Sequence, residues 1–139
     1  MRELSTYALR ASCERSRIEV LQILQGVDYP TASVILHLYH SDEYPILDFR
    51  AIWSLGLPQP TFYRFAFWTE LLTTWRAALA QCRRVETSIS PRDFDRALWQ
   101  YSKENQPRAN KRVEATSVTR AESRESLPLA VAFRSVPHA

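Results

Sequence analysis

The chain contains only two glycines and two cysteines, and it lacks long uninterrupted apolar runs. Because sheets need glycines at their turns, this scarcity favours helices joined by short loops. Cys13 and Cys82 are distant in the sequence and belong to no Cys-x-x-Cys pair, which argues against a cysteine-based zinc site or iron–sulfur cluster. No apolar segment is long enough to span a bilayer, and residues 1–17 lack a signal-peptide core. We therefore expect a cytoplasmic protein that does not enter the membrane.

An excess of charge is also missing from most of the chain. The full sequence has 18 Lys and Arg and 15 Asp and Glu, which gives a formal net charge of +3. Residues 106–139 hold six of the basic and three of the acidic residues, so residues 1–105 have 12 of each and no net charge. That balance leaves no overall electrostatic signature of nucleic-acid binding in residues 1–105. Residues 106–139 show no sustained hydrophobic period and are rich in Ser, Arg and Ala, which predicts a disordered basic tail.

Apolar residues are plentiful, at 45% of the chain with four Trp, so a folded core is expected. The length fits one domain, which we place at residues 1–105. Hydrophobic spacing and capping residues predict an all-α fold, a compact bundle of five or six helices with the third helix at its centre. The expected helices cover residues 3–11, 16–24, 30–40, 47–56, 61–83 and 91–105.

The turn around Gly26 lies between the second and third expected helices. Two helices joined by a tight glycine turn can form a hairpin whose free backbone N–H groups point at a phosphate, and the positive end of the second helix dipole adds to the attraction. Such a device holds DNA without reading its sequence. A glycine can equally join two helices that bind nothing, so the turn alone does not establish a function.

A wider pattern surrounds this turn. It consists of Leu24, Gly26 and Val27 in the turn, Thr31 and Ala32 in the next helix, and Asp48 before the following helix. In this pattern residues 16–56 resemble the helix-hairpin-helix DNA glycosylase superfamily, and residues 90–106 resemble the closing helix of some of its relatives. The resemblance implies a helix-hairpin-helix that binds duplex, damaged DNA without a cofactor. It also implies a monofunctional base-excision-repair activity with Asp48 as the catalytic carboxylate. The backbone-binding residues would be Gly26, Val27, Asp28, Thr31 and Arg50.

Three features depart from the family pattern. Pro30 replaces the lysine with which bifunctional members form a Schiff base, so lyase chemistry through that residue is excluded. Asp28 replaces the second hairpin glycine and places a negative charge where a phosphate would lie. Few residues precede the hairpin, so we expect either a shortened form of the family fold or an incomplete base pocket. These departures favour an alternative, a non-enzymatic module that keeps the fold to bind DNA or protein, with exposed apolar surface available to a protein partner or a second copy.

Several residues have two interpretations. Asp48 is either the catalytic carboxylate or the N-cap of the helix that follows. Arg50 lies two positions further on and faces elsewhere, so its partner is a phosphate or another acid. His37 and His40 are three residues apart and loosely suggest a metal site, but a partly buried and a helix-end histidine explain them as well, and we predict no metal. Aromatic residues 62–68 could stack on bases, although their spacing is also that of a core stripe.

Overall fold

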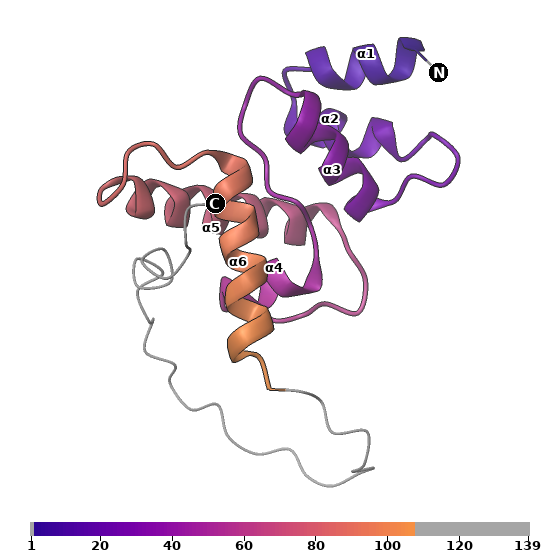
Figure 1. Cartoon of the computed structure of the whole chain (residues 1–139). Helices are drawn as coiled ribbons and strands as arrows, with labels where there is room; N and C mark the ends of the chain where they lie inside the picture. The colour runs from indigo at the N-terminus through magenta and orange to yellow at the C-terminus, as the bar shows by residue number, and fades with distance from the viewer. Residues whose placement is uncertain (1, 108–139) are drawn as a thin grey trace, which may run out of the picture.

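The computed structural model describes residues 2–107, which form six α-helices and no strand (Figure 1). The helices are α1 (Arg2–Arg10), α2 (Glu14–Leu21), α3 (Tyr29–Tyr39), α4 (Phe49–Ser54), α5 (Phe65–Arg83) and α6 (Pro91–Asn105). The prediction of an all-α fold is confirmed for this part of the chain. The predicted disordered tail lies, from residue 108 onwards, outside the described residues.

Two hydrophobic cores meet along α5. The first is formed by α1, α2 and α3 together with the segment before α4 and the first half of α5, and it includes the stacked pair Tyr44 and Trp68. The second joins the end of α5 to α6, where Trp75 and Phe94 lie edge to face with 5.5 Å between ring centroids. Helix α4 packs against α6 (Figure 1). The short helix α4 contributes one residue to each core, so the residues at its start are held between two packed units.

Local sequence signals explain the two best-defined helix ends. At the start of α6, the Ser90 hydroxyl accepts a hydrogen bond from the Asp93 N–H (3.1 Å), and the Asp93 carboxylate accepts one from the Ser90 N–H (3.4 Å). At the end of α4, the Leu57 N–H donates to the carbonyl of Ile52 (3.1 Å), with Gly56 at a φ of +73°. This is a Schellman motif, which favours glycine at the left-handed position. Both ends were predicted from the sequence.

Three predictions about the helices were wrong in detail. The second helix ends at Leu21 because the next three residues bond to carbonyls three positions back, which makes a tighter turn. The fifth helix begins at Phe65 rather than at 61, since Arg64 is extended. The third helix is not surrounded by protein, because Leu38 and Tyr39 are 58% and 71% exposed. Helix α3 therefore buries one face only.

Candidate functional site

The turn between α2 and α3 needs its glycine. The Val27 N–H donates to the carbonyl of Leu24 (3.1 Å), which closes a β-turn, and Gly26 occupies it with a φ of +78°. A side chain at this position would be strained by the backbone conformation, although an added Cβ would meet no atom within 4 Å. The structure therefore places a glycine turn between two packed helices, as the sequence predicts.

The start of α3 is already occupied by a carboxylate. Asp28 is its N-cap, and Asp28 Oδ1 accepts a hydrogen bond from the Thr31 N–H at 3.0 Å. This backbone hydrogen bond lowers the pKa of the Asp28 carboxyl. A phosphate held by the hairpin would need the same N–H group and would meet the charge of Asp28. The Thr31 N–H therefore already has an acceptor within the protein, whereas a phosphate clamp needs N–H groups that are free to bind the ligand.

Asp48 also acts as a helix cap. Its Oδ1 accepts hydrogen bonds from the backbone N–H groups of Arg50 (2.5 Å) and Ala51 (3.4 Å) at the start of α4. The capping role that the sequence left open is therefore present in the structure. The chain before Asp48 is fixed by the buried Ser33 hydroxyl, which accepts from the Leu47 N–H at 2.8 Å.

The segment that leads to Asp48 is anchored to α3 and α5 by charged and polar contacts. The Arg83 guanidinium binds both carboxylate oxygens of Glu43, at 2.8 and 2.7 Å, and lowers the pKa of that carboxyl. His37 Nδ1 lies 2.7 Å from the Tyr44 carbonyl, so this nitrogen carries the proton and donates. His40 Nδ1 instead accepts from the Asp42 N–H at 2.9 Å. Within residues 2–107, no three His, Cys, Asp or Glu residues are grouped so that they could hold a metal ion.

A second carboxylate, Asp95, lies in the electrostatic neighbourhood of Asp48. Its side chain is 13% exposed and comes from α6. Burial raises the pKa of the Asp95 carboxyl, and the charge of Asp48 adds to the increase, whereas His37 and Arg92 act against it. Arg92 Nη1 lies 3.5 Å from an Asp95 oxygen. The sequence does not single out Asp95, because an acidic residue inside an amphipathic helix is usually part of its solvated face.

Arg50 lies on a surface that combines exposed rings with positive charge. Its guanidinium carbon is 5.0 Å from the ring centroid of Phe49 and 5.0 Å from that of Trp99, and Lys103 Nζ is 5.1 Å from the Trp99 centroid. Phe49 is 53% exposed and Trp99 41%. Neither Arg50 nor Lys103 forms an ion pair with any residue in the described range. We call these four residues, Phe49, Arg50, Trp99 and Lys103, the aromatic-cationic face.

One sequence signal could have revealed this face. The buried positions of α6 are Phe94, Ala97, Leu98 and Ser102, which follow a helical period. Trp99 falls off that stripe, and Lys103 lies one turn further along the same side. A tryptophan on the polar side of an amphipathic helix is a candidate binding residue. The contact of Trp99 with Arg50 could not be predicted, because it depends on how α4 packs against α6.

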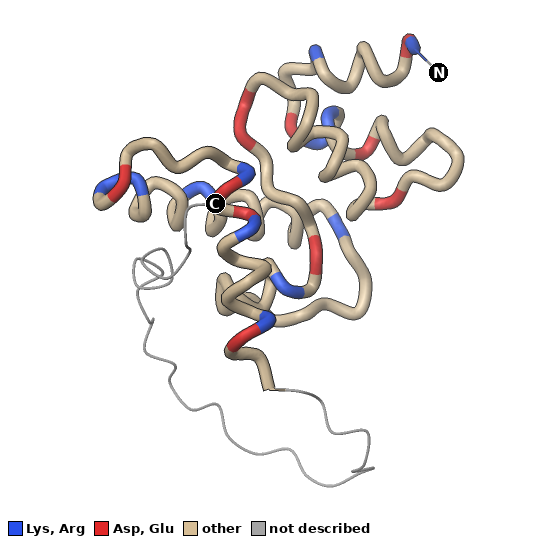
Figure 2. Tube along the Cα trace, in the orientation of Figure 1, with Lys and Arg blue, Asp and Glu red and all other residues tan. Residues whose placement is uncertain are grey.

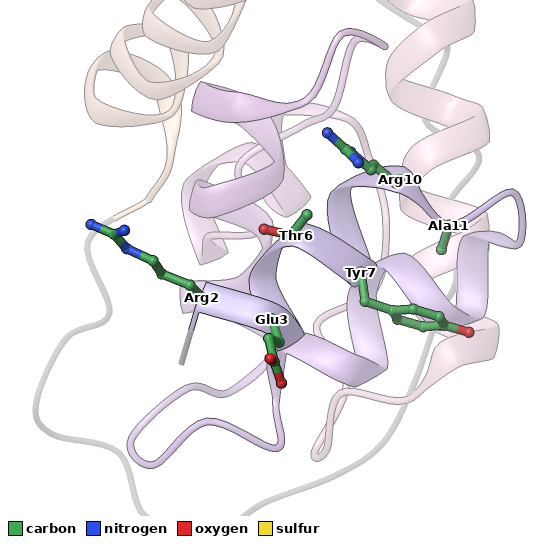
Figure 3. Close-up of a pocket in the computed structure, with 6 residues that line it drawn as sticks. All are labelled: Arg2, Glu3, Thr6, Tyr7, Arg10 and Ala11. Atoms are coloured by element: carbon green, nitrogen blue, oxygen red, sulfur yellow. The ribbon is translucent and has the colours of Figure 1, made fainter.

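The sequence-predicted residues fall into two separate groups. Gly26, Val27, Asp28 and Thr31 lie at the α2–α3 turn, and Asp48 and Arg50 lie at the start of α4, away from that turn (Figure 1). Charged residues of both signs occur along the described chain, but those from Glu19 to Asp48 are all acidic (Figure 2). A surface pocket on α1 is lined by none of these residues, and its charged side chains point apart (Figure 3). Its lining residues are Arg2, Glu3, Thr6, Tyr7, Arg10 and Ala11.

No helix among the described residues is long and apolar enough to cross a membrane. No protein-family model matches the chain, and searches of curated proteins and of solved structures give no significant match. The resemblance to the helix-hairpin-helix DNA glycosylases therefore stays a prediction from the residues that carry it.

Proposed function

We propose that the protein binds nucleic acid without excising bases, and that its contact surface is the aromatic-cationic face. The observation that supports this most directly is the placement of Arg50 against two exposed rings, with no ion-pair partner among residues 2–107. Aromatic rings beside cations suit both parts of a nucleic acid, because bases stack on aromatic side chains and phosphates bind basic ones.

The geometry at Asp48 favours binding over catalysis. One Asp48 oxygen already accepts two backbone hydrogen bonds as a helix cap. A catalytic role would therefore require the Asp48 carboxylate to cap α4 and to act on the substrate at the same time.

The charge distribution in the sequence supports the same proposal. All of the net charge of +3 lies in residues 106–139, which follow α6 directly. Lys103 is in the last turn of α6, so the basic segment begins a few residues beyond the aromatic-cationic face. Basic residues outside a specific site add salt-dependent affinity for phosphates.

The proposal can be tested with a fluorescein-labelled DNA and the full-length protein. Anisotropy would be measured at about 50 and about 200 mM salt, a range over which phosphate contacts weaken strongly. We expect binding that weakens with salt, and a loss of several-fold in the double variant Arg50→Gln/Lys103→Gln. The matched control is Arg2→Gln/Arg84→Gln, which removes two positive charges elsewhere on the described surface and should change affinity little. Absence of binding at the lower salt would contradict the proposal.

Base excision at Asp48 is a second candidate function, favoured by one observation. Burial raises the pKa of the Asp95 carboxyl, which lies in the electrostatic neighbourhood of Asp48, and general acid catalysis uses a carboxyl group with a raised pKa. The test is release of a damaged base from a duplex oligonucleotide by the wild type and not by Asp48→Asn. No release from a panel of damaged bases would leave binding as the proposed function.

A further inference from the structure

We infer that the ligand class of the aromatic-cationic face is single-stranded nucleic acid, with unstacked bases on Phe49 and Trp99 and phosphates at Arg50 and Lys103. This inference rests on the proposed function and makes it more specific, because nucleic-acid binding alone does not distinguish a duplex from a single strand.

The exposure of the two rings is the first argument. Phe49 is 53% exposed and Trp99 41%, and the two residues lie on α4 and α6. In a duplex the faces of the bases are covered by their neighbours in the stack, so exposed rings gain little from it. In a single strand every base has a free face, and stacking on an aromatic side chain does not depend on sequence.

The arrangement of the cations is the second argument. A guanidinium that lies over an aromatic face keeps its N–H donors at its edge, where they can reach phosphate oxygens. Arg50 is held in this way by two rings at 5.0 Å, and Lys103 Nζ lies 5.1 Å from the Trp99 ring. Since neither cation has an ion-pair partner in the described chain, phosphate binding would not require breaking a salt bridge.

Direct contacts between α4 and α6 hold the two halves of the aromatic-cationic face together. The Ser54 hydroxyl of α4 donates to the Leu98 carbonyl of α6 at 2.6 Å. Across the same two helices, the ring centroids of Trp53 and Tyr101 are 5.9 Å apart. A surface whose side chains are already placed loses less conformational entropy when a flexible strand binds.

Acidic groups limit the face on one side. Asp48 directly precedes Phe49, and Asp95 lies one helical turn before Trp99, whereas Lys103 lies one turn after it. Phosphates are therefore expected to follow the surface from Arg50 and Trp99 toward the C-terminal end of α6. The two cations of the face should contribute about −1.4 to the salt slope for a single strand, at about −0.7 for each neutralised phosphate.

The experiment compares labelled oligo(dT), oligo(U) and a mixed-sequence duplex of equal length, with full-length protein and anisotropy at about 50 mM salt. We expect both single strands to bind at least about tenfold more tightly than the duplex. The double variant Phe49→Leu/Trp99→Leu should lower single-strand affinity at least about tenfold, because each stacked base contributes separately. The control is Phe62→Leu, which removes a ring that is 71% exposed on another part of the surface and should leave affinity unchanged.

The possible outcomes separate the inference from the function on which it rests. Equal affinity for duplex and single strands, or unchanged single-strand affinity in Phe49→Leu/Trp99→Leu, would overturn the inference and leave nucleic-acid binding in place. No binding of any oligonucleotide at low salt would overturn both. Trp99→Phe keeps a ring and should retain most of the single-strand affinity, which guards against a variant that fails to fold. A preference between oligo(dT) and oligo(U) would assign the natural ligand to DNA or RNA.

Discussion

At the scale of single residues, two acids that the sequence suggests as functional residues, Asp28 and Asp48, act in the structure as helix caps. Asp28 and Asp48 both begin helices and both accept backbone N–H groups. The preference of Asp for this position is strong enough to account for both residues without a ligand. Their functional roles therefore need evidence beyond position.

The cap at Asp28 predicts a measurable loss of stability. Replacing Asp28 by Ala leaves the Thr31 N–H without its acceptor, so we expect unfolding in urea to require about 1 kcal/mol less free energy. Asp28→Ser keeps an acceptor and should lose much less. The pKa of Asp28 is lowered in the folded state, so its contribution is present above the ordinary value of 3.8 and is lost as the pH falls through the lowered pKa. An equal loss in both variants would contradict the capping role.

A variant of Asp28 can also distinguish nucleic-acid binding at the aromatic-cationic face from binding at the α2–α3 turn. Asp28→Asn keeps the side-chain acceptor and removes the negative charge. If the aromatic-cationic face carries the binding, oligonucleotide affinity in anisotropy should change by less than about twofold, because the hairpin does not contribute. An affinity that rises clearly in this variant would instead indicate that a phosphate lies at the start of α3.

Asp95 predicts the opposite dependence on pH. Its folded-state pKa is raised above the ordinary value, so its ionisation opposes folding as the pH rises past 3.8 and through the raised pKa. Asp95→Asn should therefore raise the melting temperature at neutral pH by a few degrees, although Arg92 loses a half-exposed ion pair. The difference should disappear when melting is measured below pH 3.8. A variant less stable than the wild type at neutral pH would show that the charge of Asp95 is needed.

At the scale of the elements, sequence signals worked where they were local. The capping box at Ser90 and the glycine turns at Gly26 and Gly56 follow from single residue types at fixed positions. The start of α5 was missed, since residues 61–64 are compatible with a helix and only the surrounding chain makes Arg64 extended. The exposure of Leu38 and Tyr39 was missed for a similar reason, because an apolar sequence does not reveal which faces find a partner.

The two glycines give a test of element ends. Each has a positive φ and open space around its missing Cβ, so Gly26→Ala and Gly56→Ala should each cost about 1 kcal/mol from backbone strain alone. Denaturant unfolding measures both. A control is Ala66→Gly in the exposed first turn of α5, where the same two residue types are exchanged in a helical conformation. A large loss in only one of the two glycine variants would mean that an additional contact acts at that turn.

At the scale of the whole molecule, the all-α class was predictable from the sequence, whereas the contacts that form the candidate site were not. Composition and hydrophobic period indicate a helical chain, because they depend on neighbours in the sequence. The aromatic-cationic face combines residues some 50 positions apart in α4 and α6, and the neighbourhood of Asp48 and Asp95 does the same. Such pairs arise from packing, and no local pattern specifies them.

The uneven charge along the chain leads to a last prediction. Residues 1–105 are neutral, so long-range attraction to phosphates must come mainly from residues 106–139. Replacing Lys111 and Arg112 by Gln in the full chain should weaken oligonucleotide binding at low salt and make the salt slope shallower by up to about 1.4 for a single strand. Affinity at high salt should change much less than in Phe49→Leu/Trp99→Leu, because stacking on the rings is not screened by ions. If the two pairs of substitutions gave the same salt dependence, the division between a basic segment that attracts the strand and a face that stacks its bases would be wrong.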